Sequence, residues 1–174
     1  MHGDVLDNAF MASLADADIV YSWGVLHHTG QMWRGMDNAI SKLKADGSAY
    51  FALYDHDIHV NPTPEYWLAV KQKYNAANWQ GKRALEAWYV WTFMLRGRVR
   101  NLPELLDTIK HYKNSRGMEA YTDLVDWLGG WPMEFAKRED VGRWAESHNL
   151  RITRMNTGEA NTEYRFARDQ REAK

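Results

Sequence analysis

The first regular pattern along the chain is a short apolar run, DIVYSW at residues 18–23, which begins without polar alternation. Such a run is typical of a β-strand covered on both faces. From 31 to 44, apolar residues recur at three- and four-residue spacing, which predicts a helix. The ADG stretch then ends that helix, with Gly47 as a left-handed cap, and SAYFALY predicts a second strand over 48–54.

Strand, helix and strand in so short a stretch predict a right-handed βαβ unit with parallel strands. The pattern then becomes helical, at 64–76, 80–96 and 102–114, and again at 137–148. Two closing segments, LRITRMNT and TEYRFARD, alternate apolar and polar residues around a turn and predict an antiparallel hairpin. We therefore expect an α/β fold with a helical insertion over 60–135.

Composition narrows the class of protein. The chain has 174 residues, which suits a single domain over 1–174, and its net charge of −1 gives no field for a nucleic-acid partner. It has no cysteine, which excludes disulfides, thiolate metal sites and cysteine nucleophiles. The start MHGDVLDNAF lacks the features of a signal peptide, and no apolar run approaches the roughly 20 residues that span a bilayer. We expect a cytoplasmic protein without a membrane partner.

Aromatic residues are abundant, with nine Trp, nine Tyr and five Phe. Two interpretations stay open: the aromatic side chains form the core of a helical layer, or they wall a pocket for a small apolar or aromatic molecule. The tryptophans concerned are those of the 60–135 region, namely Trp67, Trp79, Trp88, Trp91, Trp127 and Trp131.

Polar side chains follow both predicted strands. In parallel α/β sheets, ligands bind beyond the carboxyl ends of the strands, so these positions are candidates for a functional site. Imidazole and carboxylate groups together suit zinc, iron or manganese, and a metal site is one interpretation. Its ligands would be His27, His28, Asp55, His56 and His59.

Three motifs together carry a resemblance to a known family. YSWGVLHHTG, KADGSAYFALYD and DWLGGWPMEFAK, in this order and before a terminal hairpin, resemble the C-terminal half of a class I S-adenosylmethionine-dependent methyltransferase of the small-molecule type. The resemblance implies a partial Rossmann-like methyltransferase sheet of order 4-5-7-6 with the last strand antiparallel. It also implies S-adenosylmethionine as cofactor and a small molecule as methyl acceptor.

The resemblance also assigns roles to residues of this chain. On the cofactor side, Asp4 would accept from the adenine amino group, Val5 would lie against the adenine ring, and Ser22 and Trp23 would follow the methionine part. Facing the transferred methyl group, a histidine can act as general base. That role falls to His27 and His28, and the acceptor would meet Tyr54, Asp55, Trp127, Trp131 and Glu134.

Some parts of the family pattern have no counterpart in this sequence. The glycine-rich turn after the family's first strand and the acidic residue after its second strand are not present, so we expect an incomplete cofactor site. The same comparison leaves one edge of strand 18–23 unpaired and its apolar faces half covered. We therefore expect a homo-oligomer, or a complementing polypeptide that pairs at this edge. A further alternative is an inactive interaction module derived from a methyltransferase.

Overall fold

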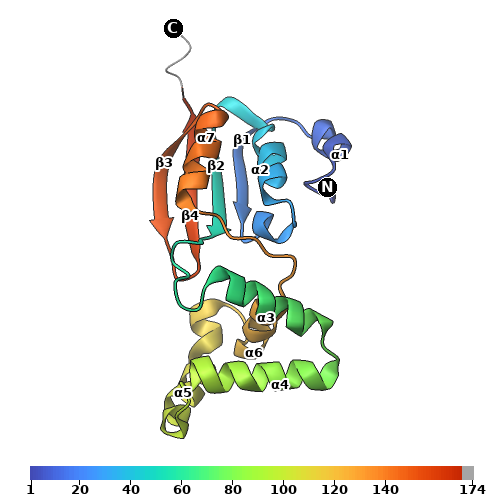
Figure 1. The fold of residues 1–174 in the computed structure, drawn as a ribbon. Coiled ribbons are helices and arrows are strands. Elements are labelled where there is room, and N and C mark those ends of the chain that lie inside the picture. The colour runs from blue at the N-terminus through green and yellow to red at the C-terminus, as the bar shows by residue number, and fades with distance from the viewer. Residues whose placement is uncertain (170–174) are drawn as a thin grey trace. The chain divides into compact units, whose positions relative to one another are not determined.

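The computed structural model describes residues 1–169 and divides them into two compact units. One unit comprises 1–64 and 132–169, and the other comprises 65–131. The first unit holds a four-stranded sheet and the second is helical (Figure 1). Each unit is described by itself. No helix in the described part of the chain combines the length and apolar character needed to cross a bilayer.

The sheet has the order β1-β2-β4-β3, from strands β1 (Ala17–Trp23), β2 (Leu43–Tyr54), β3 (Leu150–Thr157) and β4 (Asn161–Arg168). β1 and β2 are parallel, and β4 runs antiparallel to both β2 and β3. In the family numbering this is the predicted order 4-5-7-6 with the last strand antiparallel. The predicted α/β class is confirmed.

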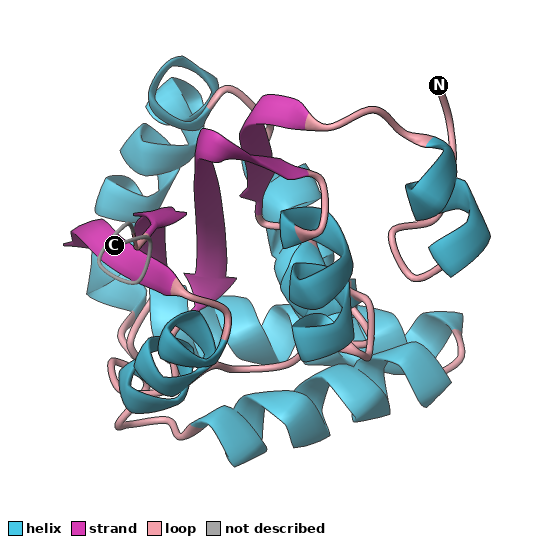
Figure 2. Ribbon diagram, turned by 90° about the horizontal axis from the view of Figure 1, so that it is seen from above, coloured by secondary structure: helices cyan, strands magenta, loops and turns pink. Residues whose placement is uncertain are grey.

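Both long helices of the sheet unit, α2 (Met32–Ile40) and α7 (Arg138–Ser147), lie on the same face of the sheet (Figures 1 and 2). The short α1 (Asn8–Ser13) lies beside α2, and Asp7 caps it by accepting from Ala9 and Phe10 N–H. The core between sheet and helices is well filled, because its members are at most 8% exposed. Its largest side chains are Met36, Phe51, Trp144, Tyr164 and Phe166.

Two expectations for β1 and β2 are wrong. The helix ends at Ile40 and β2 already begins at Leu43, so Gly47 lies inside a strand and caps nothing. A Cβ at Gly47 would lie 2.7 Å from a Leu43 side-chain carbon and 2.9 Å from the Asp18 carbonyl oxygen. The glycine therefore serves the close approach of the two strands.

β1 is also not covered on both faces. Ile19, Tyr21 and Trp23 are 70%, 65% and 51% exposed on the face opposite α2 and α7. The family resemblance implies that strand 18–23 lies at a sheet edge with its apolar faces half covered. Within residues 1–169, β1 has this arrangement. We call this surface the open face.

The second unit consists of α3 (Pro64–Ala76), α4 (Trp79–Tyr89), α5 (Leu102–Arg116) and α6 (Ala120–Gly129). α3 spans the predicted range, and α4 is followed by a wider helical turn at Val90–Met94. Its aromatic side chains pack on one another, with Trp67 lying 5.1 Å from both Phe93 and Trp127 between ring centroids. Within this unit, the aromatic residues form a core.

A buried lysine lies in this aromatic core. Lys71 is 1% exposed, its Nζ lies 4.3 Å from the Trp127 ring centroid, and it donates to the Trp127 carbonyl near the carboxyl end of α6. Burial lowers the pKa of Lys71 to about 8, against the smaller opposing effect of Asp126. Charged Lys71 thus carries a desolvation cost in the folded state.

This cost predicts a stability that depends on pH. Below pH 8 Lys71 is charged whether the chain is folded or not, whereas from there toward pH 10.5 only the unfolded state keeps the proton. The unfolded state then binds more protons, so the free energy of unfolding rises with pH. We expect Lys71→Met to stabilise the chain by about 2 kcal/mol at pH 7 and by almost nothing near pH ~9.5.

Urea unfolding followed by tryptophan fluorescence measures this difference, kept below pH ~10 where unfolded tyrosines ionise. The control is Lys73→Met, because Lys73 is exposed on the same helix. An equal gain at both pH values would show that Lys71 is not a buried charge.

Candidate functional site

The candidate site lies where β1 and β2 end. After Trp23 the chain turns at Gly24, whose φ is +72°, and continues into a 3₁₀ turn, η1 (Leu26–His28). Gly24 N–H donates to the Ala52 carbonyl, which keeps the turn beside β2. A positive φ is available to glycine at little cost, so this residue lets η1 fold back over the ends of the strands.

Gly24 gives a prediction of its own. A Cβ at this position would meet nothing within 4 Å, so only the backbone conformation opposes an alanine. We expect Gly24→Ala to lower the free energy of unfolding by about 1 kcal/mol. The matched control is Gly142→Ala in α7, also without neighbours within 4 Å, where helix propensity predicts a gain of about 0.5–1 kcal/mol. Thermal and urea unfolding test the opposite signs, and two losses or two gains would contradict this reasoning.

A segment far along the chain, 132–136, fastens η1 to the rest of the unit. Glu134 N–H donates to the His27 carbonyl at 2.8 Å, and the Glu134 carboxylate accepts from Met32 N–H at 2.8 Å, at the start of α2. A carboxylate is favoured there because the first N–H groups of a helix have no partner within the helix. Glu134, predicted to meet the acceptor, is thus part of the framework that holds η1.

The same segment continues beside β2. Ala136 N–H donates to the Tyr54 carbonyl, and His56 N–H donates to the Ala136 carbonyl, both at 2.9 Å. Asp55 and Ala136 form a parallel bridge. The segment 132–136 therefore joins the ends of β1 and β2, which fixes the positions of the two histidines.

The two histidines differ in burial and in tautomer. His27 is 1% exposed and its Nδ1 accepts from Tyr54 N–H at 3.3 Å, so the proton of neutral His27 is on Nε2. The half-buried His28 has its Nδ1 2.8 Å from the Pro132 carbonyl oxygen. Because a carbonyl only accepts, Nδ1 carries the proton and the Nε2 of neutral His28 has a lone pair. Of the pair, His28 has the tautomer of a general base.

Asp55 is held inside the unit. Its side chain is fully buried and pairs with Arg138, whose Nε lies 2.7 Å from Oδ2. The same Oδ2 accepts from the Thr162 hydroxyl, and Oδ1 accepts from Asp57 N–H at 2.7 Å. The hydrogen bond to this carboxylate raises the pKa of Arg138. Asp55 therefore has the contacts of a structural ion pair.

The metal-site interpretation is not supported. Residues 1–169 contain no group of three or more His, Cys, Asp or Glu side chains placed to hold a metal ion. Asp55, the carboxylate of the hypothesis, is bound to Arg138 and Thr162. The five proposed ligands follow two neighbouring strands, β1 and β2, but make no ligand set.

The N-terminal segment, which carries two of the residues predicted to contact the cofactor, is tied to α2. Asn38 Nδ2 donates to the Val5 carbonyl at 2.8 Å, which places half-buried Val5 against the core. The exposed Asp4 accepts from Leu6 N–H at 2.8 Å through Oδ1. Half-buried Ser22 and exposed Trp23 are adjacent at the end of β1. Trp127 and Trp131 belong to the 65–131 unit.

Glu163 on β4 is a residue that the sequence analysis missed. It accepts from the Trp23 indole N–H at 3.2 Å and from Asn156 at 3.2 Å. Hydrogen bonds from Tyr50, Trp23 and Asn156 lower its pKa, and the bond to Glu163 raises the pKa of Tyr50 to about 12. Trp23, Tyr50, Asn156 and Glu163 lie on four different strands, which only the pairing of the sheet brings together, so no local motif could reveal them.

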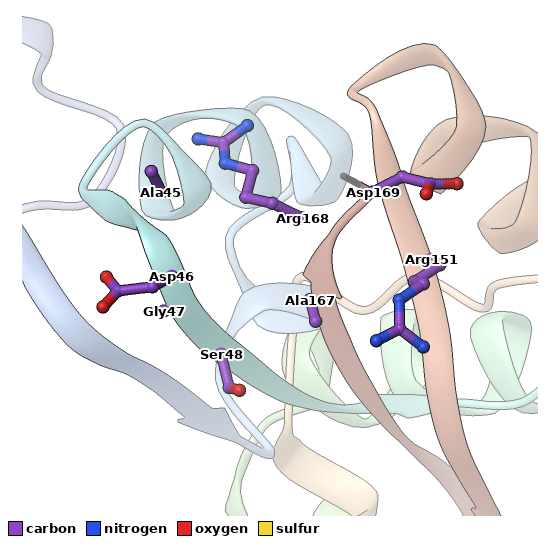
Figure 3. A pocket seen from close by; sticks show the side chains of 8 residues that line it. All are labelled: Ala45, Asp46, Gly47, Ser48, Arg151, Ala167, Arg168 and Asp169. Atoms are coloured by element: carbon purple, nitrogen blue, oxygen red, sulfur yellow. The ribbon is translucent and has the colours of Figure 1, made fainter. Parts of the chain in front are cut away.

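A pocket of about 490 Å³ lies at the opposite end of the parallel strands (Figure 3). Arg151 and Arg168 line it, together with the start of β2. Arg168 donates to the carbonyls of Ile40 and Leu43 at 3.5 and 3.4 Å, so its guanidinium closes the helix-to-strand turn. This pocket contains none of the predicted site residues.

Comparison with solved structures shows which fold this chain resembles. The chain matches an O-methyltransferase family protein from Burkholderia thailandensis over 99% of its own length, with a TM-score of 0.51 and 13% identity. It also matches the structure of TnmH over 96%, with a TM-score of 0.43 and 13% identity. The chain spans about a third of these proteins, 36% and 34% respectively. No protein-family model and no curated protein matches the sequence. The chain thus has a methyltransferase-like α/β fold.

Proposed function

We propose that this chain carries the acceptor side and part of the cofactor side of an S-adenosylmethionine-dependent O-methyltransferase, with His28 as the general base. The observation that carries the proposal is the His28 hydrogen bond to the Pro132 carbonyl at the carboxyl ends of β1 and β2. The fold of the O-methyltransferase family protein supports the reaction class.

The residues at this end of the sheet fit such a cofactor. Gly24 leaves open space where a side chain would stand, so a ligand can approach the backbone closely. Trp23 and Val25 offer apolar surface, at 51% and 56% exposure, and Asp4 offers an exposed carboxylate. When bound, S-adenosylmethionine supplies an electrophilic methyl group.

The part of His28 in the reaction follows from its tautomer. Its neutral Nε2 would accept the proton of an acceptor hydroxyl as that oxygen bonds to the methyl carbon, while the carbon–sulfur bond of the cofactor would break and S-adenosylhomocysteine would leave. The Pro132 carbonyl orients the ring and stabilises the positive charge that forms on it. His27, packed at 4.6 Å between ring centroids, supports the His28 ring from within the unit. Alignment of acceptor and methyl group supplies much of the remaining rate.

Transfer of labelled methyl from S-adenosylmethionine to a panel of small phenols tests the proposal. We expect methylated phenol that depends on both enzyme and acceptor. Labelled product from amine acceptors but from no hydroxyl acceptor would contradict the role of His28, because an amine needs no base. Failure to label any acceptor would contradict the activity itself.

A further inference from the structure

Trp23, Ala52 and Glu163 form a row across three neighbouring strands. Trp23 is the register partner of Ala52 on β2, and Ala52 is the register partner of Glu163 on β4. Because neighbouring strands lie about 4.8 Å apart, roughly 10 Å separates the Cα atoms of Trp23 and Glu163. Their side chains nevertheless meet, since the indole N–H donates to Glu163 Oε1 at 3.2 Å. The indole ring therefore extends across β2.

Ala52 leaves room for this crossing. Its neighbours Phe51 and Leu53 belong to the core, and side chains alternate along a strand, so the Ala52 side chain lies on the open face. The ring of Trp23 reaches Glu163 by passing over β2 at this small residue, and Ala52 is only 1% exposed. Trp23 itself stays 51% exposed, so its ring is fixed at the N–H end and still presents a large apolar surface.

Glu163 is itself held in place. Its carboxylate accepts from Asn156 Nδ2 on β3 at 3.2 Å and from the Tyr50 hydroxyl on β2, as well as from Trp23 on β1. These bonds lower the pKa of Glu163, which keeps the carboxylate charged at neutral pH. A charged acceptor forms hydrogen bonds roughly twice as strong as a neutral one does. Glu163 is thus a fixed anchor for the indole N–H.

We propose that Glu163 is a positioning residue for the cofactor, because it fixes the Trp23 indole ring at the carboxyl end of β1, where the ring lies along the methionine part of S-adenosylmethionine. The inference rests on the proposed function, in which Trp23 contacts the cofactor. Glu163 acts through Trp23 and does not touch the ligand. A ring that is already in place loses less freedom on binding, and ordering one side chain weakens a complex by about 3- to 10-fold.

Calorimetric titration with S-adenosylhomocysteine tests the proposal. We expect Glu163→Ala to raise the dissociation constant by about 3- to 10-fold. Glu163→Gln should stay within about twofold of the wild type, because the side-chain oxygen of glutamine still accepts the indole N–H. The matched control is Arg165→Ala, which removes an exposed charged residue from the same strand and the same face and should leave the dissociation constant unchanged.

A double-mutant cycle shows whether the effect passes through Trp23. Phenylalanine has no N–H to donate, so we expect Trp23→Phe to weaken binding and Glu163→Ala to weaken it no further in that background. An equal loss with and without Trp23 would overturn the proposal, because Glu163 would then act in another way. A Glu163→Ala chain that binds as the wild type does would also overturn it, while leaving the methyltransferase proposal in place. No binding by the wild-type chain at millimolar ligand would contradict both.

Discussion

We expect His28→Gln to lower the rate of the proposed methyl transfer to a hydroxyl acceptor by roughly 10²–10⁴-fold, the range attributed to a positioned general base. Glutamine is uncharged and of similar length, and the backbone hydrogen bonds of Glu134 and Ala136 still hold the segment 132–136 in place. It cannot accept a full proton. The loss therefore falls on the chemical step.

A comparison with another histidine separates this effect from misfolding. His111→Gln changes a histidine on α5 that bonds the Asp107 carbonyl, and we expect it to leave the rate unchanged. A His28→Gln rate within about threefold of the wild type would remove the base from the mechanism.

Replacing Asp55 with alanine lowers the free energy of unfolding of the sheet unit by about 3 kcal/mol. Removing one partner of a buried ion pair costs about 3–5 kcal/mol, and the lower end applies because the Arg138 side chain is 35% exposed. The Thr162 hydroxyl, which donates to the same carboxylate, loses its acceptor as well. Urea unfolding followed by circular dichroism measures the change.

The control for this ion pair lies one residue further along α7. Glu139 pairs with Arg143, and their side chains are 76% and 63% exposed. Glu139→Ala is expected to cost at most about 0.5 kcal/mol, as exposed pairs do. If the two substitutions had equal effects, burial would not be the reason for the stability of the Asp55–Arg138 pair.

The sequence predicts well what local pattern determines. Helix α3 begins at Pro64 as expected because proline suits the first turn, and the closing hairpin follows from the alternation in β3 and β4. The strand order came from the family resemblance of whole motifs. Local residue patterns alone gave only the parallel βαβ unit and the hairpin.

The wrong predictions depend on contacts between distant segments. Gly47 has the sequence context of a helix cap. Its role is instead set by two close neighbours, the Asp18 backbone carbonyl and the Leu43 side chain. DIVYSW has the composition of a fully buried strand, although α2 and α7 both cover the other face of the sheet. Composition records how apolar a strand is, and the packing of helices decides which of its faces is covered.

In the candidate site as well, local sequence indicates candidate residues, whereas contacts between distant segments decide their roles. Two adjacent histidines after a strand were a clear signal, yet their different roles depend on Pro132 and Tyr54, which lie far from them in the sequence. The family resemblance assigns Asp55, at the end of a strand, to the acceptor. Its partner Arg138 is 83 residues away in the sequence, and no local motif predicts that the two side chains meet.

One measurement tests the methyltransferase proposal most directly: titration of the ¹⁵N-labelled chain with S-adenosylhomocysteine, followed residue by residue. The proposal predicts saturable shifts at residues 4–5, at 22–28 and at the Trp23 indole N–H, even where an incomplete cofactor site binds weakly. Shifts confined to other parts of the chain, or none at millimolar ligand, would contradict it.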